Sequence, residues 1–303
     1  MACSQQLDLH LKEKYPMLQF FTERPFGVEI ETYGLNYVVT PLDGGMIKPY
    51  NIWSRAKDGR RLHQLCKDLT ICLGSDRQSW HFEEDSSIVG RGGAELVSPV
   101  LRGLDGLIQV YHSLQFLAAI DRVKVNDSCG FHVHHGVDKD SYGCDQIRKL
   151  VSLVYPLEEQ LYTLIPGERQ NSATCRPMEI DIDRFLASCD NSCQNGNCRI
   201  KQLWYSPENR YEPEAPHRYD KTRYHGLNLH SYWYRSTIEF RYHSAVLADI
   251  DEAMQWIIFT QFLVELSSGF TPEIPYYAGA NKWLRTIYRL YRRHGLTDLI
   301  AGS

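Results

Sequence analysis

The chain has 303 residues, of which 43% are hydrophobic and 12% aromatic, so it can bury a large core and no long disordered stretch is expected. Its 33 basic and 37 acidic side chains give a net charge of −4, which provides no electrostatic reason to expect a nucleic acid or a membrane surface as partner. The longest apolar run, residues 254–266, is interrupted by polar residues and is far shorter than the roughly 20 residues of a membrane-spanning helix.

The N-terminal sequence and the cysteines favour a cytoplasmic protein. Residues 1–21 lack the basic segment, the apolar run and the small-residue cleavage site of a secretory signal. Nine cysteines in a chain of this length favour reduced thiols over a disulfide framework. We therefore expect a location in the cytosol.

The first hundred residues predict mostly strands. Residues 26–31 (FGVEIE) alternate apolar and acidic side chains with the period of a half-buried strand, which puts Glu29 and Glu31 on its polar face. The same criteria predict a strand at 35–40, a polar helix at about 59–73, and two strands at 80–84 and 94–100 joined by a glycine-rich loop.

The middle of the chain predicts a histidine-bearing strand between two helices. In CGFHVHHGV, residues 129–137, alternation places Phe131 and Val133 on one face and His132 and His134 on the other. The flanking helices are expected at 104–120, where apolar residues recur at helical spacing, and at 146–164.

The last third of the chain begins with weak periodicity and ends with clear elements. Residues 166–221 predict a long insertion or lid over a site, with one short helix at 182–187. The remaining expected elements are strands at 224–231 and 236–243 and helices at about 249–268 and 280–294. This order predicts an α+β fold in which an antiparallel β-sheet has helices on one side.

Three of the predicted strands carry polar pairs at i, i+2 spacing, which sends both side chains to the same face. The pairs are Glu29 with Glu31, His132 with His134, and Glu239 with Arg241, and Asp85 and Glu95 are expected beside them. Crowded carboxylates repel one another and are costly to bury, so cations or water must lie among them. Carboxylates with one or two imidazoles suit Mg²⁺ or Mn²⁺. Taken singly, each pair also fits an ordinary solvated strand face or a cross-strand ion pair.

Four cysteines and one aromatic segment each allow two interpretations. Cys175, Cys189, Cys193 and Cys198 are either zinc ligands or reduced thiols, because their spacing lacks a CxxC knuckle. The aromatic segment 223–236 (RYHGLNLHSYWYRS) either stacks a nucleobase or packs across neighbouring strands.

Several motifs in order resemble the amidoligase family, within the superfamily of carboxylate–amine ligases that includes glutamine synthetase and glutamate–cysteine ligase. They are FGVEIET, WHFEEDSSI with GAELVSPVL, NDSCGFHVHHG, RYHGLNLHSYW and TIEFRYH, and they extend from about residue 26 to about residue 266. The resemblance implies a curved antiparallel sheet similar to the glutamine synthetase catalytic domain, with ATP and divalent metals on its concave face. It divides the chain into an extension at 1–24 and a catalytic domain at 25–303.

The resemblance also implies roles for individual residues. The metal ligands it implies are Glu29, Glu31, Glu95, His132 and Glu239. It places His134 near the nucleotide phosphates and Arg241 on the transferred phosphate, with Glu239 and Arg241 as the catalytic pair. Arg223, Asn228 and Arg169 are expected to anchor the substrate carboxylate or the nucleotide, whereas Asp85 and Ser87 receive no role.

The activity implied is ATP-dependent amide-bond formation through an acyl phosphate, with Mg²⁺ or Mn²⁺, on a small amino acid or a peptide. Two alternatives remain: a zinc-dependent amide hydrolase, since His-x-His strands occur in such enzymes, and a non-catalytic binding protein that retains the fold. The sequence determines neither the two substrates nor the oligomeric state.

Overall fold

A computed structural model describes residues 14–35, 46–47, 64, 67, 73–74, 78–166, 169–188, 198–205, 220–275 and 282–301. Residues 36–40 of the predicted strand at 35–40, most of the predicted helix at 59–73, and Cys189 and Cys193 lie outside these residues. The division into an extension and a catalytic domain stays a prediction.

Seven strands of the described residues form one sheet in the order β2-β3-β4-β1-β5-β7-β6, and every neighbouring pair is antiparallel. The strands are β1 (Phe26–Thr32), β2 (Met46–Ile47), β3 (His81–Glu84), β4 (Ala94–Val97), β5 (Phe131–Gly136), β6 (Leu227–Asn228) and β7 (Thr237–Phe240). A small parallel pair, β8 (Ile274–Pro275) with β9 (Ile300–Ala301), lies apart from this sheet in the strand pairing.

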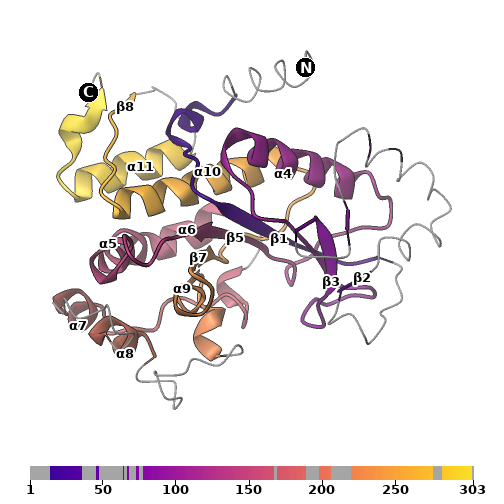
Figure 1. Cartoon of the computed structure of the whole chain (residues 1–303), viewed down its shortest axis with the longest axis horizontal. Helices are drawn as coiled ribbons and strands as arrows, with labels where there is room; N and C mark the ends of the chain where they lie inside the picture. The colour runs from indigo at the N-terminus through magenta and orange to yellow at the C-terminus, as the bar shows by residue number, and fades with distance from the viewer. Residues whose placement is uncertain are drawn as a thin grey trace.

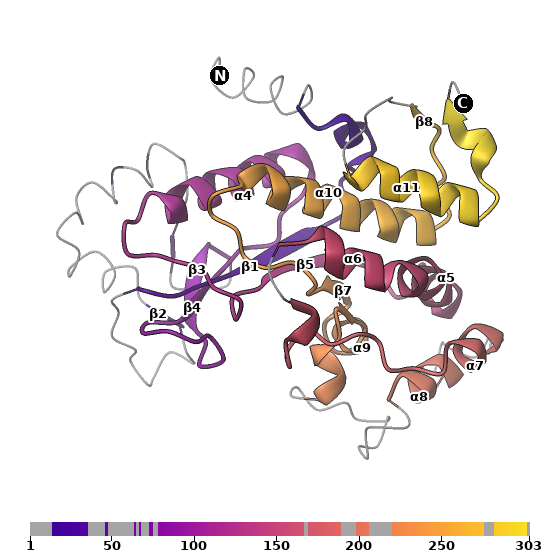
Figure 2. The same cartoon turned by 180° about the vertical axis from the view of Figure 1, so that it is seen from behind.

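Helices lie on both sides of the sheet (Figures 1 and 2). On one side are α4 (Gly103–Ala118), α10 (Ile250–Ser267) and α11 (Lys282–Arg293), and on the other are α7 (Ile182–Ala187), α8 (Arg199–Tyr205) and α9 (His230–Arg235). The other described helices are α5 (Cys144–Val154), α6 (Glu158–Leu164) and the 3₁₀ segments η1 (Pro16–Phe20), η3 (Tyr155–Leu157), η4 (Arg169–Asn171), η6 (Lys221–Tyr224) and η7 (Thr297–Leu299).

The core lies between the apolar face of the sheet and the helices α4 and α10. Strand residues such as Val28, Val133 and Phe240 are almost completely buried there, as their alternation with polar residues requires. Helix α10 is buried on nearly every side because it also contacts α5, and its Trp256 packs against Trp283 of α11. No helix in the described part of the chain, α10 included, is long and apolar enough to cross a membrane.

The predicted α+β fold with an antiparallel sheet is confirmed, and most of its elements fall where the periodicity places them. The prediction that helices lie on one side only is wrong, because α7, α8 and α9 lie on the polar side, where residues of α9 line a cavity together with the strands. The hairpin of β3 and β4, the helices α4, α10 and α11, and the short helix α7 agree with prediction to within a few residues. The helix predicted at 146–164 is divided into α5, η3 and α6 around Pro156, because proline has no N–H to continue the helical hydrogen bonds.

The strand predicted at 224–231 is confirmed only at Leu227–Asn228, because Tyr224 ends η6 and a helix begins at His230. Only Leu227–Asn228 pairs with β7, and the next residues form α9. The Asn228 side chain accepts a hydrogen bond from the backbone N–H of Ser231 at 3.3 Å, and Ser236 ends the helix in the left-handed conformation at φ 58°. Aromatic contacts of Trp233 with Trp204 and Tyr205 of α8 hold this helix in place, and such contacts are invisible to local periodicity.

The expectation of reduced thiols holds for part of the cysteines only. Cys129, Cys175 and Cys198 are free and buried. Cys144, the first residue of α5, is disulfide-bonded, which contradicts the expectation for that residue.

Candidate active site

The register of the sheet brings the predicted polar pairs together. Glu29 lies opposite His132 where β1 pairs with β5, Glu31 opposite Glu95 where β1 pairs with β4, and His134 opposite Glu239 where β5 pairs with β7. Paired residues in an antiparallel ladder share a face, so these side chains converge. They line a cavity of about 250 Å³, here called the polar cavity, whose charged and imidazole residues include Glu29, Glu31, His81, Glu83, Asp85, Glu95, His132, His134, Arg223, Glu239 and Arg241.

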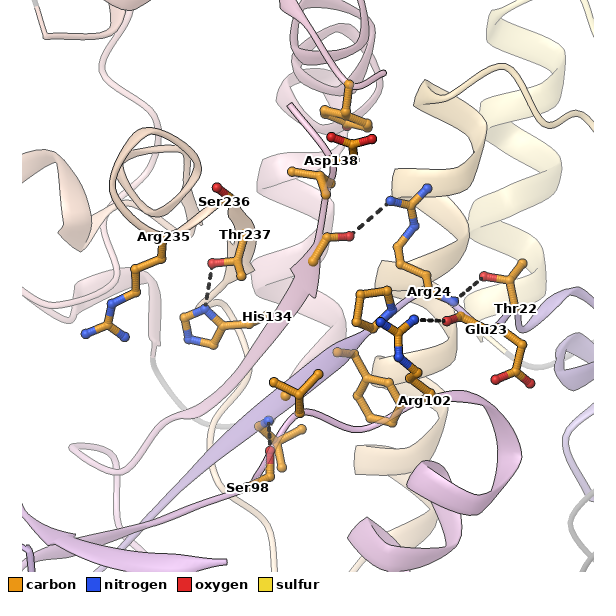
Figure 3. A pocket seen from close by; sticks show the side chains of 18 of the residues that line it. Thr22, Glu23, Arg24, Ser98, Arg102, His134, Asp138, Arg235, Ser236 and Thr237 are labelled. Carbon is orange, nitrogen blue, oxygen red and sulfur yellow. Dashed lines mark hydrogen bonds between the residues drawn. The ribbon is translucent and has the colours of Figure 1, made fainter. Parts of the chain in front are cut away.

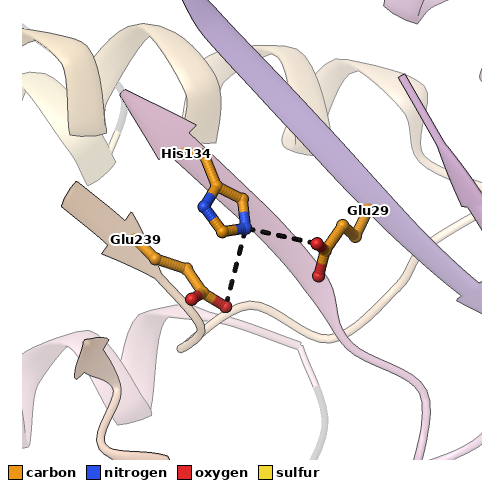
Figure 4. A group of neighbouring side chains, drawn as sticks. All are labelled: Glu29, His134 and Glu239. Atoms are coloured by element: carbon orange, nitrogen blue, oxygen red, sulfur yellow. Dashed lines mark ion pairs between the residues drawn. The ribbon is translucent and has the colours of Figure 1, made fainter. Parts of the chain in front are cut away.

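One possible metal site combines two carboxylates with an imidazole. Glu29, His134 and Glu239, the histidine-containing group, each offer a ligand atom, and these atoms all lie within 4.8 Å of one another (Figure 4). The Nε2 of His134 is 3.4 Å from Glu29 Oε1 and 3.7 Å from Glu239 Oε1.

A second possible metal site consists of carboxylates alone. Glu31, Asp85 and Glu95, the all-carboxylate group, meet the same criterion of 4.8 Å. Glu31 is fixed because its Oε2 accepts a 2.5 Å hydrogen bond from the backbone N–H of Gly130, and Asp85 accepts one from the N–H of Ser87 at 2.7 Å. Asp85, which received no role from the sequence, therefore lies among the predicted metal ligands.

His132 lies between the two groups. Its Nδ1 is 3.2 Å from Glu29 Oε2, and its Nε2 is 3.5 Å from Glu31 Oε1. The Nε2 atoms of both His132 and His134 are buried, and neither has a hydrogen-bond partner among the described residues. Buried polar atoms are ordinarily satisfied, so two orphaned imidazole nitrogens beside crowded carboxylates fit a divalent cation.

Two carboxylates of the site have lowered pKa values, and a third has a raised pKa. Burial favours the neutral acid, yet the charge of His134 holds the pKa of Glu29 well below its ordinary value, and His134 with Arg241 lowers that of Glu239 to about 2. Burial and the charges of Glu29 and Glu31 instead raise the pKa of Glu95 well above its ordinary value. A cation bound near Glu95 would therefore displace a proton.

Arg241 faces the same cavity and is held on two sides. Its Nη1 donates to Glu239 Oε1 at 2.6 Å, and its Nε donates to the carbonyl oxygen of Thr174 at 3.2 Å. Asn228 Nδ2 donates to the other oxygen of Glu239 at 2.5 Å, so both oxygens of this carboxylate have partners. Arg223 also lines the cavity.

Arg169, predicted as an anchor for a ligand, is not among the residues that line the polar cavity. Its side chain is buried, and Nη2 donates to the backbone carbonyl of Arg241 at 3.3 Å. A Cβ at position 130 would collide with both His132 Nε2 and Arg169 Nη2, so Gly130 allows these two groups to lie close together. Arg169 thus contacts the backbone of a cavity residue instead of lining the cavity.

Sequence reasoning missed further residues of the polar cavity, including His81 and Glu83 of β3 and His230, Tyr234 and Arg235 of α9. The residues of β3 had a signal, because His81, Glu83 and Asp85 alternate just as Glu29 and Glu31 do. Those of α9 had none, because a strand was predicted where the helix forms.

A larger cavity of about 1,080 Å³ adjoins the polar cavity (Figure 3). The two share five lining residues, which are Glu29, Val97, Ser98, His134 and Arg235. Much of its lining is apolar or backbone, from Pro25–Val28 and Pro99–Val100, with Arg24 and Arg102 among its cations. Arg24 is already paired with Glu265, at 2.8 Å, and Arg102 donates to the carbonyl oxygen of Glu23 at 3.1 Å.

Residues 22–264 match the model of a protein family described as "putative amidoligase enzyme". The matched range contains all seven strands of the sheet and every residue of the two possible metal groups. A search of curated proteins found no match to the chain.

Proposed function

Because the chain belongs to the amidoligase family, we propose that it is an ATP-dependent ligase that joins a carboxylate to an amine. The observation that carries this proposal is the convergence of two carboxylate-bearing groups and Arg241 on one face of the sheet. Phosphoryl transfer requires such an inventory, because negative charge must be neutralised among crowded phosphate oxygens.

Mg²⁺ or Mn²⁺ would be held by Glu29, His134 and Glu239 and by Glu31, Asp85 and Glu95, and would neutralise the phosphates and polarise the transferred group. His132, between the two groups, would complete either one or keep them apart. The predicted set of ligands is thereby changed in two respects, since His134 joins it and Asp85 is added.

The residues of the chain have separate tasks in the proposed reaction. An oxygen of the substrate carboxylate attacks the γ-phosphorus of ATP, the bond to ADP breaks, and an acyl phosphate forms. The amine nitrogen then attacks the acyl carbon, inorganic phosphate leaves, and the nitrogen loses a proton to water. Arg241, oriented by Glu239 and Thr174, would stabilise the phosphate charge in both steps.

The larger cavity supports a substrate of peptide size. Its 1,080 Å³ exceeds the usual range of roughly 300–1,000 Å³ for small-molecule sites, and it reaches the histidine-containing group at Glu29 and His134. We assign it to the substrate that carries the carboxylate or the amine, an amino acid or a peptide.

The donor set supports this proposal better than zinc hydrolysis. Structural and catalytic zinc sites use mainly histidine and cysteine, whereas five of the six residues in the two groups are carboxylates. Within the described residues, neither Cys175 nor Cys198 belongs to a possible metal group, and Cys175 packs against Tyr162.

Calorimetric titration of ATP, with and without Mg²⁺, tests the nucleotide site without knowledge of the other substrates. We expect binding that requires Mg²⁺ and is weakened at least tenfold in Glu239→Ala. Glu84→Ala is the matched control, because Glu84 is exposed on β3 and outside the cavity. ATP binding that does not require Mg²⁺ and is unchanged in Glu239→Ala would contradict the proposal.

A second assay separates a ligase from a binding protein. Hydroxylamine can replace the amine, so incubation with ATP, Mg²⁺ and a panel of amino acids and peptides should yield hydroxamates together with equimolar ADP. ADP without hydroxamate would indicate hydrolysis of ATP alone, and neither product would indicate a binding protein.

A further inference from the structure

Tyr234 is an exposed aromatic ring on the border of the polar cavity. Its residue is 46% exposed, although it belongs to the same helix as Tyr232, which is 7% exposed and packed in the core. Tyr234 nevertheless lines the polar cavity together with Glu29 and Glu239. Burial in the core therefore does not account for this ring.

The ring stacks on a neighbouring side chain of the same helix, which also lines the polar cavity. The imidazole of His230, one helical turn earlier, stacks against it with ring centroids 5.7 Å apart and planes 14° apart. His230 is itself buried, and its Nδ1 is 2.7 Å from the hydroxyl of Tyr205 in α8. One face of Tyr234 is thus covered by a rigid neighbour.

The residue after Tyr234 connects the ring to the possible metal groups. Arg235 lines the polar cavity, and its Nη1 lies 4.0 Å from Glu29 Oε1. An aromatic ring, a cation and the carboxylates of the histidine-containing group therefore line the same cavity. This combination matches the base, the phosphates and the metal ions of a bound nucleotide.

The size of the polar cavity places the base at its border. About 250 Å³ is below the roughly 300–1,000 Å³ of sites that enclose a whole small molecule, so phosphates and metals fit inside while the base stays at the opening. Among the described residues, the larger cavity offers no comparable ring, since Phe26 and Tyr142 in its lining are each 2% exposed.

We infer that Tyr234, backed by His230, is the surface on which the base of the nucleotide stacks. The inference rests on the proposed function, because it takes the phosphates to lie at the metal groups. Stacking on a ring already fixed in place loses little conformational entropy, and removal of the ring should weaken nucleotide binding about 5- to 100-fold.

The test compares two ligands that differ in the base. Mg²⁺–ATP and Mg²⁺–tripolyphosphate are titrated calorimetrically into the wild type, Tyr234→Ala, Tyr234→Leu and Tyr234→Phe. We expect Tyr234→Ala and Tyr234→Leu to weaken the binding of Mg²⁺–ATP about 5- to 100-fold and to leave the affinity for Mg²⁺–tripolyphosphate unchanged. Tyr234→Phe should retain wild-type affinity for both. Phe270→Ala, which removes another exposed ring (42%) outside the polar cavity, should change neither affinity.

The outcomes separate this inference from the proposed function. If the wild type binds Mg²⁺–ATP and the Tyr234 variants bind it equally well, or lose both ligands alike, the stacking role is wrong and the ligase proposal stands. If the wild type binds no Mg²⁺–ATP, both are wrong. Tyr234→Leu keeps an apolar side chain, so it provides the measurement should Tyr234→Ala fold poorly.

Discussion

The charge of a single residue in this site depends on its neighbours more than on its type. Glu29 and Glu95 are both half-buried glutamates on adjoining strands, yet the pKa of the first is held low by His134 and that of the second is raised by burial and by other carboxylates. The same side chain therefore serves as a permanent anion at one position and as a proton-binding group at another.

Glu158, outside the cavity, makes the stability of the fold depend on pH. Burial raises its pKa from 4.5 to about 7, although it accepts hydrogen bonds from Tyr242 and from the N–H of Met178. Below pH 4.5 both the folded and the unfolded protein carry this proton. As pH rises towards 7 the unfolded chain releases it first, so the free energy of unfolding falls by about 3 kcal/mol across this window and no further above it.

Glu158→Gln should remove this contribution, because glutamine stays neutral at every pH. Urea unfolding at pH 5, 6, 7 and 8 provides the measurement, with Glu159→Gln on the same helix as control. A wild-type slope retained in Glu158→Gln would show that another group is responsible.

Arg241 would stabilise the phosphate charge in the proposed reaction, so Arg241→Ala should reduce turnover about 10²-fold or more. Arg241→Lys keeps the positive charge but cannot reach both Glu239 and Thr174, so it should recover only part of the rate. Hydroxamate formation measures the rates. Wild-type turnover in Arg241→Ala would exclude the residue from the chemistry.

At the scale of elements, strand alternation and strand pairing together determine which polar side chains converge. Alternation places Glu29, His132 and Glu239 on a polar face, and the antiparallel register then brings their strands side by side. The register itself depends on contacts between distant segments, so the division into two groups was not predictable, whereas Asp85 was expected on this face without a role. Helix α9 was missed because contacts with α8 determine it.

The segment before β1 is fastened to α10 by an ion pair with two hydrogen bonds. Arg24 donates to both oxygens of Glu265, at 2.8 and 2.9 Å, and also to the carbonyl of Gly136 at 3.1 Å. Both side chains are largely buried, so loss of one partner leaves a charge without compensation.

Glu265→Gln should therefore lower the free energy of unfolding by about 2 kcal/mol. Chemical denaturation measures the change, with the exposed Glu273→Gln as control. In a double-mutant cycle, Arg24→Gln together with Glu265→Gln should cost less than the sum of the single changes. Strict additivity would show that the pair contributes nothing to stability.

At the scale of the whole molecule, the carboxylates of the polar cavity repel one another, and bound cations would reduce this repulsion. Mg²⁺ should raise the Tm, since a ligand at one hundred times its Kd stabilises the folded state by about 2.7 kcal/mol. The raised pKa of Glu95 shows that its negative charge is unfavourable in the folded protein. Glu95→Gln should therefore be more stable than the wild type without metal, and Mg²⁺ should raise its Tm less.

Thermal unfolding in EDTA and at several Mg²⁺ concentrations measures both effects, and Glu84→Gln serves as control. If Mg²⁺ raises the Tm of wild type and Glu95→Gln equally, Glu95 is not a metal ligand.

The two cavities share five lining residues, Glu29 and His134 among them, and are otherwise lined by different residues. A nucleotide in one cavity therefore leaves the other accessible, and both reactants can be resident before any bond changes. Initial-rate kinetics should accordingly follow a sequential mechanism, with intersecting double-reciprocal plots. Parallel plots would mean instead that the first product departs before the second reactant arrives.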